Sequence, residues 1–238
     1  MQPKKYIAAI LGGSGSVGKN VLKSLLADSQ CDKVILLSRR ELDDLKALDP
    51  ERIQVELCNP IDDLSKENLI NVGASDANVN VAFCTLGHGS SRKASKEDLY
   101  RVDAEIPGKF AAACQKAGVT HYCLMTAVGS DESAQWSSWT KSGAGGGWYN
   151  HVKGVAERLT EEAKLPYTYI AQPATLRGSP HTPKIVEMIP DCLIPLKYSS
   201  ANVADIAKGM VTKTINAFQE NKKGIEKTTG GIPISKGE

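Results

Sequence analysis

The chain has 238 residues, a formal net charge of +2, 41% hydrophobic and 24% charged residues, all ordinary values for a globular protein. Lysine and arginine are scattered rather than gathered in one stripe, which argues against a nucleic-acid partner. The apolar run near the amino terminus ends at Gly12, too short for a signal peptide or a membrane span, and no later run reaches the length of a membrane span. We therefore expect no membrane partner and a cytoplasmic location.

Short, nearly continuous apolar runs predict six strands that are buried on both faces, over residues 5–11, 33–38, 53–57, 79–86, 121–127 and 166–172. Helical stretches alternate with these runs, at 16–28, near 62–70, at 97–118, at 148–165 and near 202–220. Pro107 lies inside the third of these helices and predicts a kink. The alternation predicts an α/β fold, a doubly wound parallel sheet of the Rossmann type.

The amino-acid composition changes after residue 172, where five prolines occur within 26 residues. We interpret 173–238 as a proline-rich segment on the substrate side, appended to a single domain that spans 1–238. The glycine-rich stretch 142–147 predicts a loop, and 132–147 is interpreted as a flap. Its tryptophans and the one that follows either shape an apolar pocket or pack in the core: Trp136, Trp139 and Trp148.

The most informative stretch is "AAILGGSGSVGKNV", residues 8–21, which predicts a strand, a glycine turn and a helix. Gly13, Gly15 and Gly18 fit the pattern GxGxxG, and Gly12, Gly15 and Gly18 fit GxxGxxG. Glycines here allow a sharp turn, a close approach of backbone to a pyrophosphate and a tight start of the helix. A phosphate would then lie at the helix amino end, where free N–H groups and the helix dipole favour negative charge.

The end of the second predicted strand carries Ser38, Arg39 and Arg40. An acidic residue at this point usually binds the adenosine ribose of NAD, and it would repel a 2′-phosphate. Guanidinium groups can instead bind that phosphate through paired charge-assisted hydrogen bonds. The sequence therefore predicts NADP(H) rather than NAD(H).

The stretch "WYNHVKG" separates Tyr149 and Lys153 by four positions near the start of a predicted helix, so both side chains leave the same face. A tyrosine hydroxyl exchanges protons near neutral pH only if its pKa falls from about 10, and a nearby ammonium favours the phenolate. We interpret Tyr149 as the general acid/base of a hydride-transfer reaction and Lys153 as its electrostatic partner, which also reaches the nicotinamide ribose.

With these motifs the chain resembles the short-chain dehydrogenase/reductase superfamily, in particular its atypical branch that includes the HIV Tat-interacting-protein-like oxidoreductases. The resemblance runs from about Ile7 to Val211 through "ILGGSGSVGKNVLKSLL", "KVILLSRR", "VAFCTLGHGSSR", "YRVDAE", "HYCLMTAVGSD", "WYNHVKGVAERL", "AQPATLRG" and "NVADIAKGMV". It implies a Rossmann-type domain that holds NADPH. The residues it implies at the cofactor, besides the two arginines and Lys153, are Gly12, Ser14, Gly15, Ser16, Val17, Gly18, Ser38, Asn59, Thr85, Leu86, Gly87, Pro173, Ala174 and Thr175.

The chain departs from the family pattern at the end of the fifth strand, where a serine pair commonly supplies a hydroxyl to the substrate carbonyl. Here Thr126 is followed by Ala127, so Thr126 or Ser130 is the candidate for that hydroxyl.

Two hypotheses remain from these residues. The first is an NADPH-dependent enzyme that reduces a carbonyl or enone group of a small apolar substrate. The second is a non-catalytic NADP(H)-binding scaffold that docks on a protein partner, and a homodimer is open in both.

The cysteines and histidines suggest no further site. The six cysteines form no CxxC pair, and we expect them to be reduced. His121 and His181 lack companions at metal-ligand spacing, so no metal site is predicted. We interpret His88 as a solvent-exposed loop residue and His151 as structural.

Overall fold

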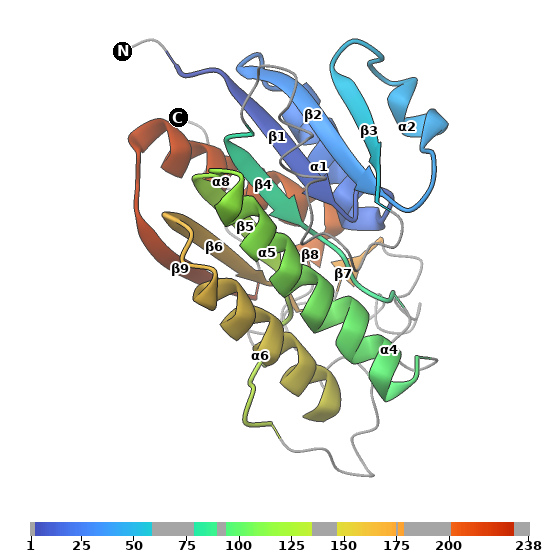
Figure 1. Cartoon of the computed structure of the whole chain (residues 1–238), viewed down its shortest axis with the longest axis vertical. Coiled ribbons are helices and arrows are strands. Elements are labelled where there is room, and N and C mark those ends of the chain that lie inside the picture. Colours follow the sequence, from blue (N-terminus) through green and yellow to red (C-terminus); the bar gives the residue numbers. More distant parts are fainter. Residues whose placement is uncertain are drawn as a thin grey trace.

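The computed structural model describes residues 3–58, 79–89, 94–134, 147–174, 176–178 and 201–230. Seven parallel strands form its main sheet in the spatial order β3-β2-β1-β4-β5-β6-β9 (Figure 1). Their bounds are β1 Tyr6–Leu11, β2 Cys31–Ser38, β3 Ile53–Leu57, β4 Val81–Cys84, β5 His121–Met125, β6 Tyr167–Gln172 and β9 Gly224–Thr229. Two short strands, β7 (Leu176–Arg177) and β8 (Ala201–Asn202), pair separately.

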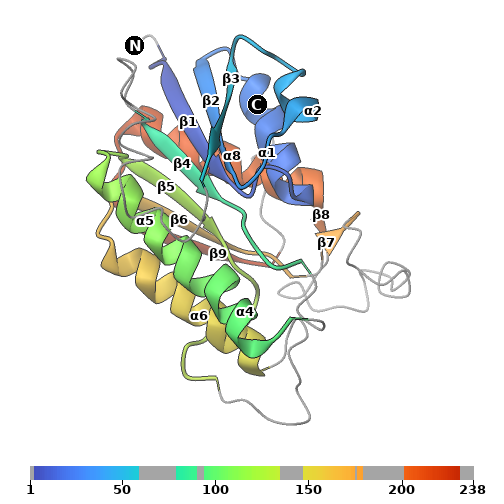
Figure 2. The ribbon, with the colours of Figure 1, turned by 45° about the vertical axis from the view of Figure 1, so that its right-hand side comes forward.

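Helices cover both faces of this sheet, as the edge-on view shows (Figure 2). One face packs against α1 and α8, and the other against the rod of α4, η2 and α5 together with α6. The bounds are α1 Ser16–Leu26, α2 Asp43–Lys46, α4 Lys96–Tyr100, η2 Arg101–Glu105, α5 Ile106–Lys116, α6 Gly147–Glu162 and α8 Val203–Glu220. The predicted doubly wound α/β fold is confirmed.

The six predicted strands are confirmed. Five of them are central strands that bury both faces and so read as continuous apolar runs, whereas β3 lies at one edge of the sheet and is mostly partly buried. The seventh strand, β9, was not predicted. It lies at the edge of the sheet, its sequence is GIEKTT, and most of its side chains are exposed. An edge strand needs few apolar residues, so apolar runs alone do not reveal it.

The predicted kink at Pro107 takes a different form. Residues 96–116 form one rod in which α4 passes through the π-helical turn η2 before α5 begins. Pro107 lies in the first turn of α5 and has no N–H to donate to the turn that precedes it, which is the π turn η2. The irregularity is therefore the π turn just before the proline, and the rod continues through it.

The part of the chain after residue 172 enters the main layers in its described portion. Helix α8 packs against α1, and β9 extends the sheet beside β6 (Figure 2). These residues therefore complete the sheet rather than form an appended segment. Three predicted segments lie wholly or mostly outside the described residues: the proline-rich stretch beyond residue 178, the helix near 62–70 and most of the flap at 132–147.

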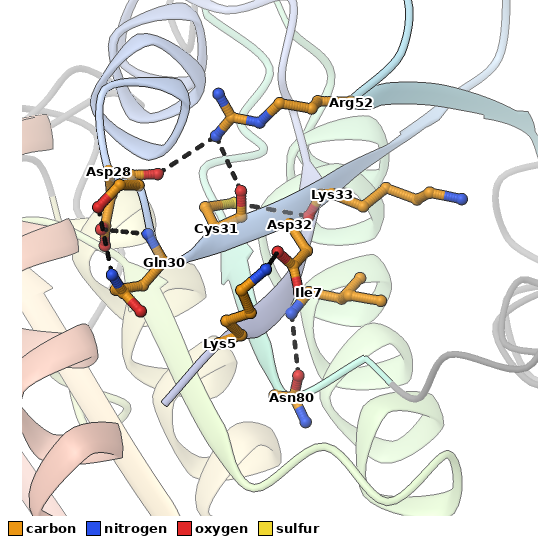
Figure 3. A network of polar contacts seen from close by, with 10 residues as sticks. Lys5, Ile7, Asp28, Gln30, Cys31, Asp32, Lys33, Arg52 and Asn80 are labelled. Carbon is orange, nitrogen blue, oxygen red and sulfur yellow. Dashed lines mark hydrogen bonds and ion pairs between the residues drawn. The ribbon is translucent and has the colours of Figure 1, made fainter. Parts of the chain in front are cut away.

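A polar network connects the amino ends of β1 and β2 to the end of α1 (Figure 3). It lies at the opposite end of the strands from the glycine turn. The guanidinium of Arg52 donates to the main-chain oxygens of Leu26 and Cys31, both at 2.9 Å, and of Asp28 at 3.3 Å. Carbonyls at the end of a helix have no partner within the helix. Arg52 supplies that partner and joins α1 to β2.

Candidate functional site: a glycine corner and a buried tyrosine–lysine–aspartate cluster

The loops that follow β1 and β4 touch at Gly12. Gly12 has φ +91°, and a Cβ added to it would lie 2.7 Å from the Leu86 nitrogen. The Thr85 hydroxyl donates to the Gly12 oxygen over 3.2 Å. A side chain at Gly12 would be strained and would separate the two loops, so only glycine suits this position.

The carbonyl oxygen of Gly12 then organises the turn into α1. The Gly15 N–H donates to it over 3.0 Å, and a Cβ on Gly18 would lie 2.2 Å from it. Gly13 is packed under Leu36, whose Cδ2 would lie 3.0 Å from an added Cβ. The turn is closed on its inner side by these main-chain contacts.

The outer side of the turn is open. Ser14 and Gly15 are exposed, and Ser16 and Val17 begin α1. Within the described residues no side chain caps this helix, and its first turn carries no acidic residue. The first N–H groups of a helix lack internal partners and attract anions. The turn therefore fits a dinucleotide pyrophosphate, as the fingerprint predicts.

The end of β2 offers positive charge at the same edge of the sheet. Ser38 is buried, and its hydroxyl accepts the Arg40 N–H over 3.2 Å. Arg39 and Arg40 are both exposed, and neither has an ion pair within the described ranges. Asn59, which the resemblance implies at the cofactor, lies outside the described residues.

Tyr149 and Lys153 come together near the start of α6, as their spacing predicts. The Lys153 Nζ lies 5.8 Å from the centre of the partly buried Tyr149 ring. The same Nζ lies 2.7 Å from the Asp103 Oδ1, and both charged side chains are about 5% exposed. The other Asp103 oxygen accepts the main-chain N–H of His88 over 2.8 Å. The cluster joins α6, the π turn η2 and the loop after β4.

This cluster borders the predicted cofactor loop. A Cβ on Gly87 would lie 3.2 Å from the Asp103 Oδ1 and 3.9 Å from the Lys153 Nζ. Leu86 is partly buried and Gly87 is exposed. The backbone at Gly87 therefore lies over the ion pair, which brings the acid/base candidates to the edge that also carries the glycine turn.

Burial and charge act on this cluster in opposite directions. Burial raises the pKa of Tyr149 above its ordinary value of 10.0, the Lys153 charge lowers it, and the Asp103 charge raises it. Burial would lower the pKa of Lys153, but the Asp103 carboxylate holds it above its ordinary value of 10.5. The Lys153 amine is therefore protonated and the Tyr149 phenol is neutral at physiological pH.

The hydroxyl of Thr126 is hydrogen-bonded to a side chain of α6. It donates to the buried Glu157 Oε1 over 2.6 Å, and the same oxygen accepts the Gln172 Nε2 over 2.8 Å. Lys227 of β9 donates to the other Glu157 oxygen over 3.0 Å. The Ser130 hydroxyl, the second candidate, donates to the Ala127 oxygen over 2.6 Å. The role of Thr126 at a substrate stays a prediction, and it would require the bond to Glu157 to break.

The loop after β6 meets the loop after β5. The Pro173 oxygen accepts the Val128 N–H over 2.9 Å, and Ala174 is partly buried. Thr175 lies outside the described residues. These contacts bring Pro173 and Ala174, which the resemblance implies at the cofactor, to the edge of the sheet that carries the other site residues.

Trp148, which follows the flap and lies in α6, is the one of the three predicted tryptophans among the described residues, and it packs against neighbouring rings. It stacks on Tyr100 with ring centres 6.3 Å apart and on His151 at 5.0 Å. The His151 Nδ1 lies 2.6 Å from the Glu132 oxygen, a structural contact. Trp136 and Trp139 lie outside the described residues, so a pocket shaped by the flap stays a prediction.

Sequence reasoning missed two acidic residues at the site, Asp103 and Glu157. The signal for Asp103 was available: it recurs at helical spacing with Leu99, Ile106 and Phe110, which form the buried face of their rod. A carboxylate on an apolar face is rarely left without a partner. The partner, Lys153, is far along the chain, so its identity required the fold.

Other site types find no support in the described parts of the chain. No group of three histidine, cysteine or acidic side chains is arranged to hold a metal ion among those residues. None of the described helices combines the length and the apolar character needed to span a membrane. The described cysteines are free and buried: Cys31, Cys58, Cys84, Cys114 and Cys123.

Comparisons with known sequences agree with the geometry. The model of a family described as NAD(P)H-binding matches residues 12–214. Protein HTATIP2 of Rattus norvegicus is 29% identical over 169 residues, which cover 70% of this chain and 61% of that protein. The match therefore spans less than two thirds of the rat protein. Protein fmp52-1, mitochondrial, of Aspergillus terreus is 24% identical over 96% of this chain and 97% of its own length.

Solved structures show the same fold. A short-chain dehydrogenase from Streptomyces avermitilis superposes with a TM-score of 0.63 at 17% identity, over 96% of this chain and 89% of that one. The yeast methylglyoxal/isovaleraldehyde reductase Gre2, complexed with NADPH, superposes with a TM-score of 0.64 at 15% identity, over 94% and 78%. With the glycine corner, the family model over residues 12–214 shows that the chain belongs to the NAD(P)H-binding family.

Proposed function

We propose that this protein is an NADPH-dependent oxidoreductase that reduces a carbonyl or enone group of a small apolar molecule. The observation that carries the proposal is the Tyr149–Lys153 pair beside Gly87, at the same edge of the sheet as the open amino end of α1. Ligands of open α/β sheets bind at this edge, where the strand order reverses between neighbouring strands. Here β1 lies between β2 and β4, so the reversal is at the glycine corner.

Each part of this edge has a separate task in the proposed reaction. The main-chain N–H groups of Ser14, Ser16 and Val17 would hold the pyrophosphate, while the Gly15 N–H stays bonded to the Gly12 oxygen. Arg39 and Arg40 would hold the 2′-phosphate. Bound NADPH would supply the hydride. Tyr149 would donate its proton to the substrate oxygen, and Lys153 would use its remaining N–H donors to orient the nicotinamide ribose.

The test of activity is NADPH oxidation across a panel of carbonyl and enone compounds. The panel includes methylglyoxal and isovaleraldehyde, which the name of the yeast structural neighbour mentions. We expect Tyr149→Phe to lower kcat about 10²- to 10⁴-fold, the usual contribution of a positioned acid. Tyr167→Phe is the matched control, since its hydroxyl contacts Glu226 on β9. Activity that survives Tyr149→Phe would remove the mechanism.

The preference for NADPH has its own test. Replacing both Arg39 and Arg40 by alanine should weaken NADPH binding roughly 10- to 100-fold, because charge-assisted hydrogen bonds to the 2′-phosphate are lost. NADH binding should change little. The control replaces the exposed pair Lys222 and Lys223 by alanine, which alters the net charge equally. Equal weakening of both cofactors by the arginine variant would contradict the assignment.

A second candidate function is a non-catalytic NADP(H)-binding scaffold that docks on a protein partner. The observation in its favour is that the Thr126 and Ser130 hydroxyls donate to protein acceptors and that Ala127 has no hydroxyl. A site of this kind would lack one transition-state hydrogen bond to the substrate oxygen. NADPH that binds tightly but is not oxidised by any member of the panel, with a partner recovered only in its presence, would favour the scaffold.

A further inference from the structure

A buried ion pair between Lys153 and Asp103 lies next to Tyr149, the candidate proton donor. The proposed reaction assigns no role to Asp103. The Asp103 Oδ1 lies 2.7 Å from the Lys153 Nζ, and both side chains are about 5% exposed. The Asp103 Oδ2 accepts the main-chain N–H of His88 over 2.8 Å. Both carboxylate oxygens are therefore fixed, one by the ammonium and one by the loop after β4.

The π turn η2 brings Asp103 to this position. Residues 101–105 form the one π-helical turn in the described part of the rod, and Asp103 is its central residue. A π turn inserts an extra residue into a helix and rotates the side chains around it, and such turns are frequent at functional sites. Helix α6 packs directly on η2, so a carboxylate at this point of the turn meets Lys153.

The ion pair changes what Lys153 does to Tyr149. An unpaired ammonium near a phenol favours the phenolate, which can withdraw a proton from an alcohol. A carboxylate 2.7 Å from that ammonium acts on the ring with the opposite sign and so weakens its effect. Burial and the Asp103 charge accordingly outweigh the Lys153 charge, and the pKa of Tyr149 lies above its ordinary value.

The other charged groups near the cluster do not reverse this balance. Cys84 at the end of β4 is fully buried, and burial raises the pKa of its thiol to about 11, so it is neutral. Glu157 lies on α6 two turns beyond Tyr149, but it is paired with Lys227. From the loop after β4, His88 contributes its main-chain N–H to the carboxylate.

We propose that Asp103 is a positioning residue that holds the Lys153 ammonium and keeps the Tyr149 hydroxyl protonated, so that the site is set to donate a proton in reduction. This inference rests on the proposed function. In the reduction the carbonyl carbon gains the hydride supplied by NADPH, and the carbonyl oxygen takes the Tyr149 proton. The products are the alcohol and NADP⁺, and a solvent proton restores the phenol. The reverse reaction needs the phenolate first, which Asp103 disfavours.

The test is a titration of the full chain labelled with ¹³Cζ-tyrosine, followed by NMR without cofactor or substrate. The Tyr149→Phe variant identifies the Tyr149 signal. In the Asp103→Asn variant we expect the Tyr149 deprotonation midpoint to fall by about one pH unit or more, the usual effect of an uncancelled neighbouring charge. A midpoint that is unchanged or higher than in the wild type would overturn the proposal.

A second variant keeps the proposal testable if Asp103→Asn does not fold because it leaves a buried ammonium unpaired. Asp103→Asn combined with Lys153→Met removes both charges and leaves no buried ion. We expect its Tyr149 midpoint to lie within about half a pH unit of the wild type, because the two charges act on the ring with opposite signs. A rise of about one unit or more would mean that Lys153 acts uncancelled in the wild type, which contradicts the proposal.

A kinetic measurement links the titration to direction. With an active carbonyl compound from the panel and its alcohol, Asp103→Asn should move the pH profile of alcohol oxidation about one unit towards neutral. The failure modes are distinct. Turnover that survives Tyr149→Phe would contradict the proposed function, whereas an unshifted Tyr149 titration in Asp103→Asn would contradict only the role of Asp103.

Discussion

Contacts to one atom, the Gly12 carbonyl oxygen, shape the glycine turn between β1 and α1. The Gly12 carbonyl oxygen receives the Gly15 N–H and the Thr85 hydroxyl, and the backbone of Gly18 lies against it. These contacts fill the inner side of the turn and leave the N–H groups at the start of α1 facing outward. The corner is therefore closed by main chain on one side and open to an anion on the other.

Replacing Gly18 by alanine tests this packing through the sign of its effect. An alanine inside a helix usually stabilises it by about 0.5–1 kcal/mol relative to glycine. Here the added Cβ would lie 2.2 Å from the Gly12 oxygen. We expect Gly18→Ala to lower the free energy of unfolding by about 1–3 kcal/mol, the usual effect of overpacking. Urea denaturation measures it, with the exposed Lys19→Ala as control; a stabilised Gly18→Ala would show that the corner is looser than described.

The residues that sequence could assign are those with a local pattern. The glycine turn, the arginines after β2 and the Tyr149–Lys153 spacing each follow from neighbours along the chain. Thr126 differs, because its hydroxyl proton goes to Glu157, which lies 31 positions away. Asp103 differs in the same way, because its partner Lys153 is on another helix. Side-chain pairing across elements depends on packing, and one sequence does not contain it.

The ends of elements are where this fold needs specific polar contacts. The Arg52 guanidinium, 29% exposed, donates to the Leu26 carbonyl at the end of α1 and to the Cys31 carbonyl at the start of β2. The strands β1, β2 and β4 can be predicted from sequence because they are buried on both faces and are therefore apolar along nearly their whole length. The polar edge strand β9 and the π turn η2 carry no such signal.

Arg52→Ala should therefore destabilise the protein by about 2 kcal/mol, because several carbonyl oxygens lose a charged donor. Arg52→Lys should recover less than half of this loss, since an ammonium cannot reach the same set of oxygens in the guanidinium geometry. Lys33→Ala is the control, because its amine makes one long contact of 3.4 Å to Gln54. Thermal and urea unfolding measure these differences; an Arg52→Ala variant as stable as Lys33→Ala would contradict the role of Arg52.

At the scale of the whole molecule, the candidate site and the buried residue His121 lie at opposite ends of the sheet. The glycine corner and Tyr149 lie at the carboxyl ends of the strands, whereas His121 begins β5 at the other end. Its buried ring packs between Tyr167 and Phe218, with ring centres 5.1 and 5.5 Å away. Burial lowers the pKa of His121 from its ordinary value of 6.5, main-chain contacts raise it, and the Lys4 charge lowers it. The folded protein therefore keeps this ring neutral.

This has a predictable effect on stability. Because the folded state binds the His121 proton less readily than the unfolded state, stability contributed by this group is present above about pH 6.5 and falls as pH drops below it. The loss is at most about 1.4 kcal/mol per pH unit. His121→Phe should reduce the fall in unfolding free energy between pH 7 and 5, about the range in which a histidine titrates. The exposed His88→Gln should leave it unchanged, and identical slopes in wild type and His121→Phe would refute the assignment.

The central claim is that the turn between β1 and α1 presents its main-chain amides to a dinucleotide pyrophosphate. A titration of the ¹⁵N-labelled protein with NADPH, followed amide by amide in two-dimensional NMR, tests it most directly. The account predicts that the largest shifts occur at Ser14, Ser16 and Val17, with smaller ones at Arg39 and Arg40. NADPH that binds without moving the Ser14, Ser16 and Val17 amides, or that does not bind at all, would contradict it.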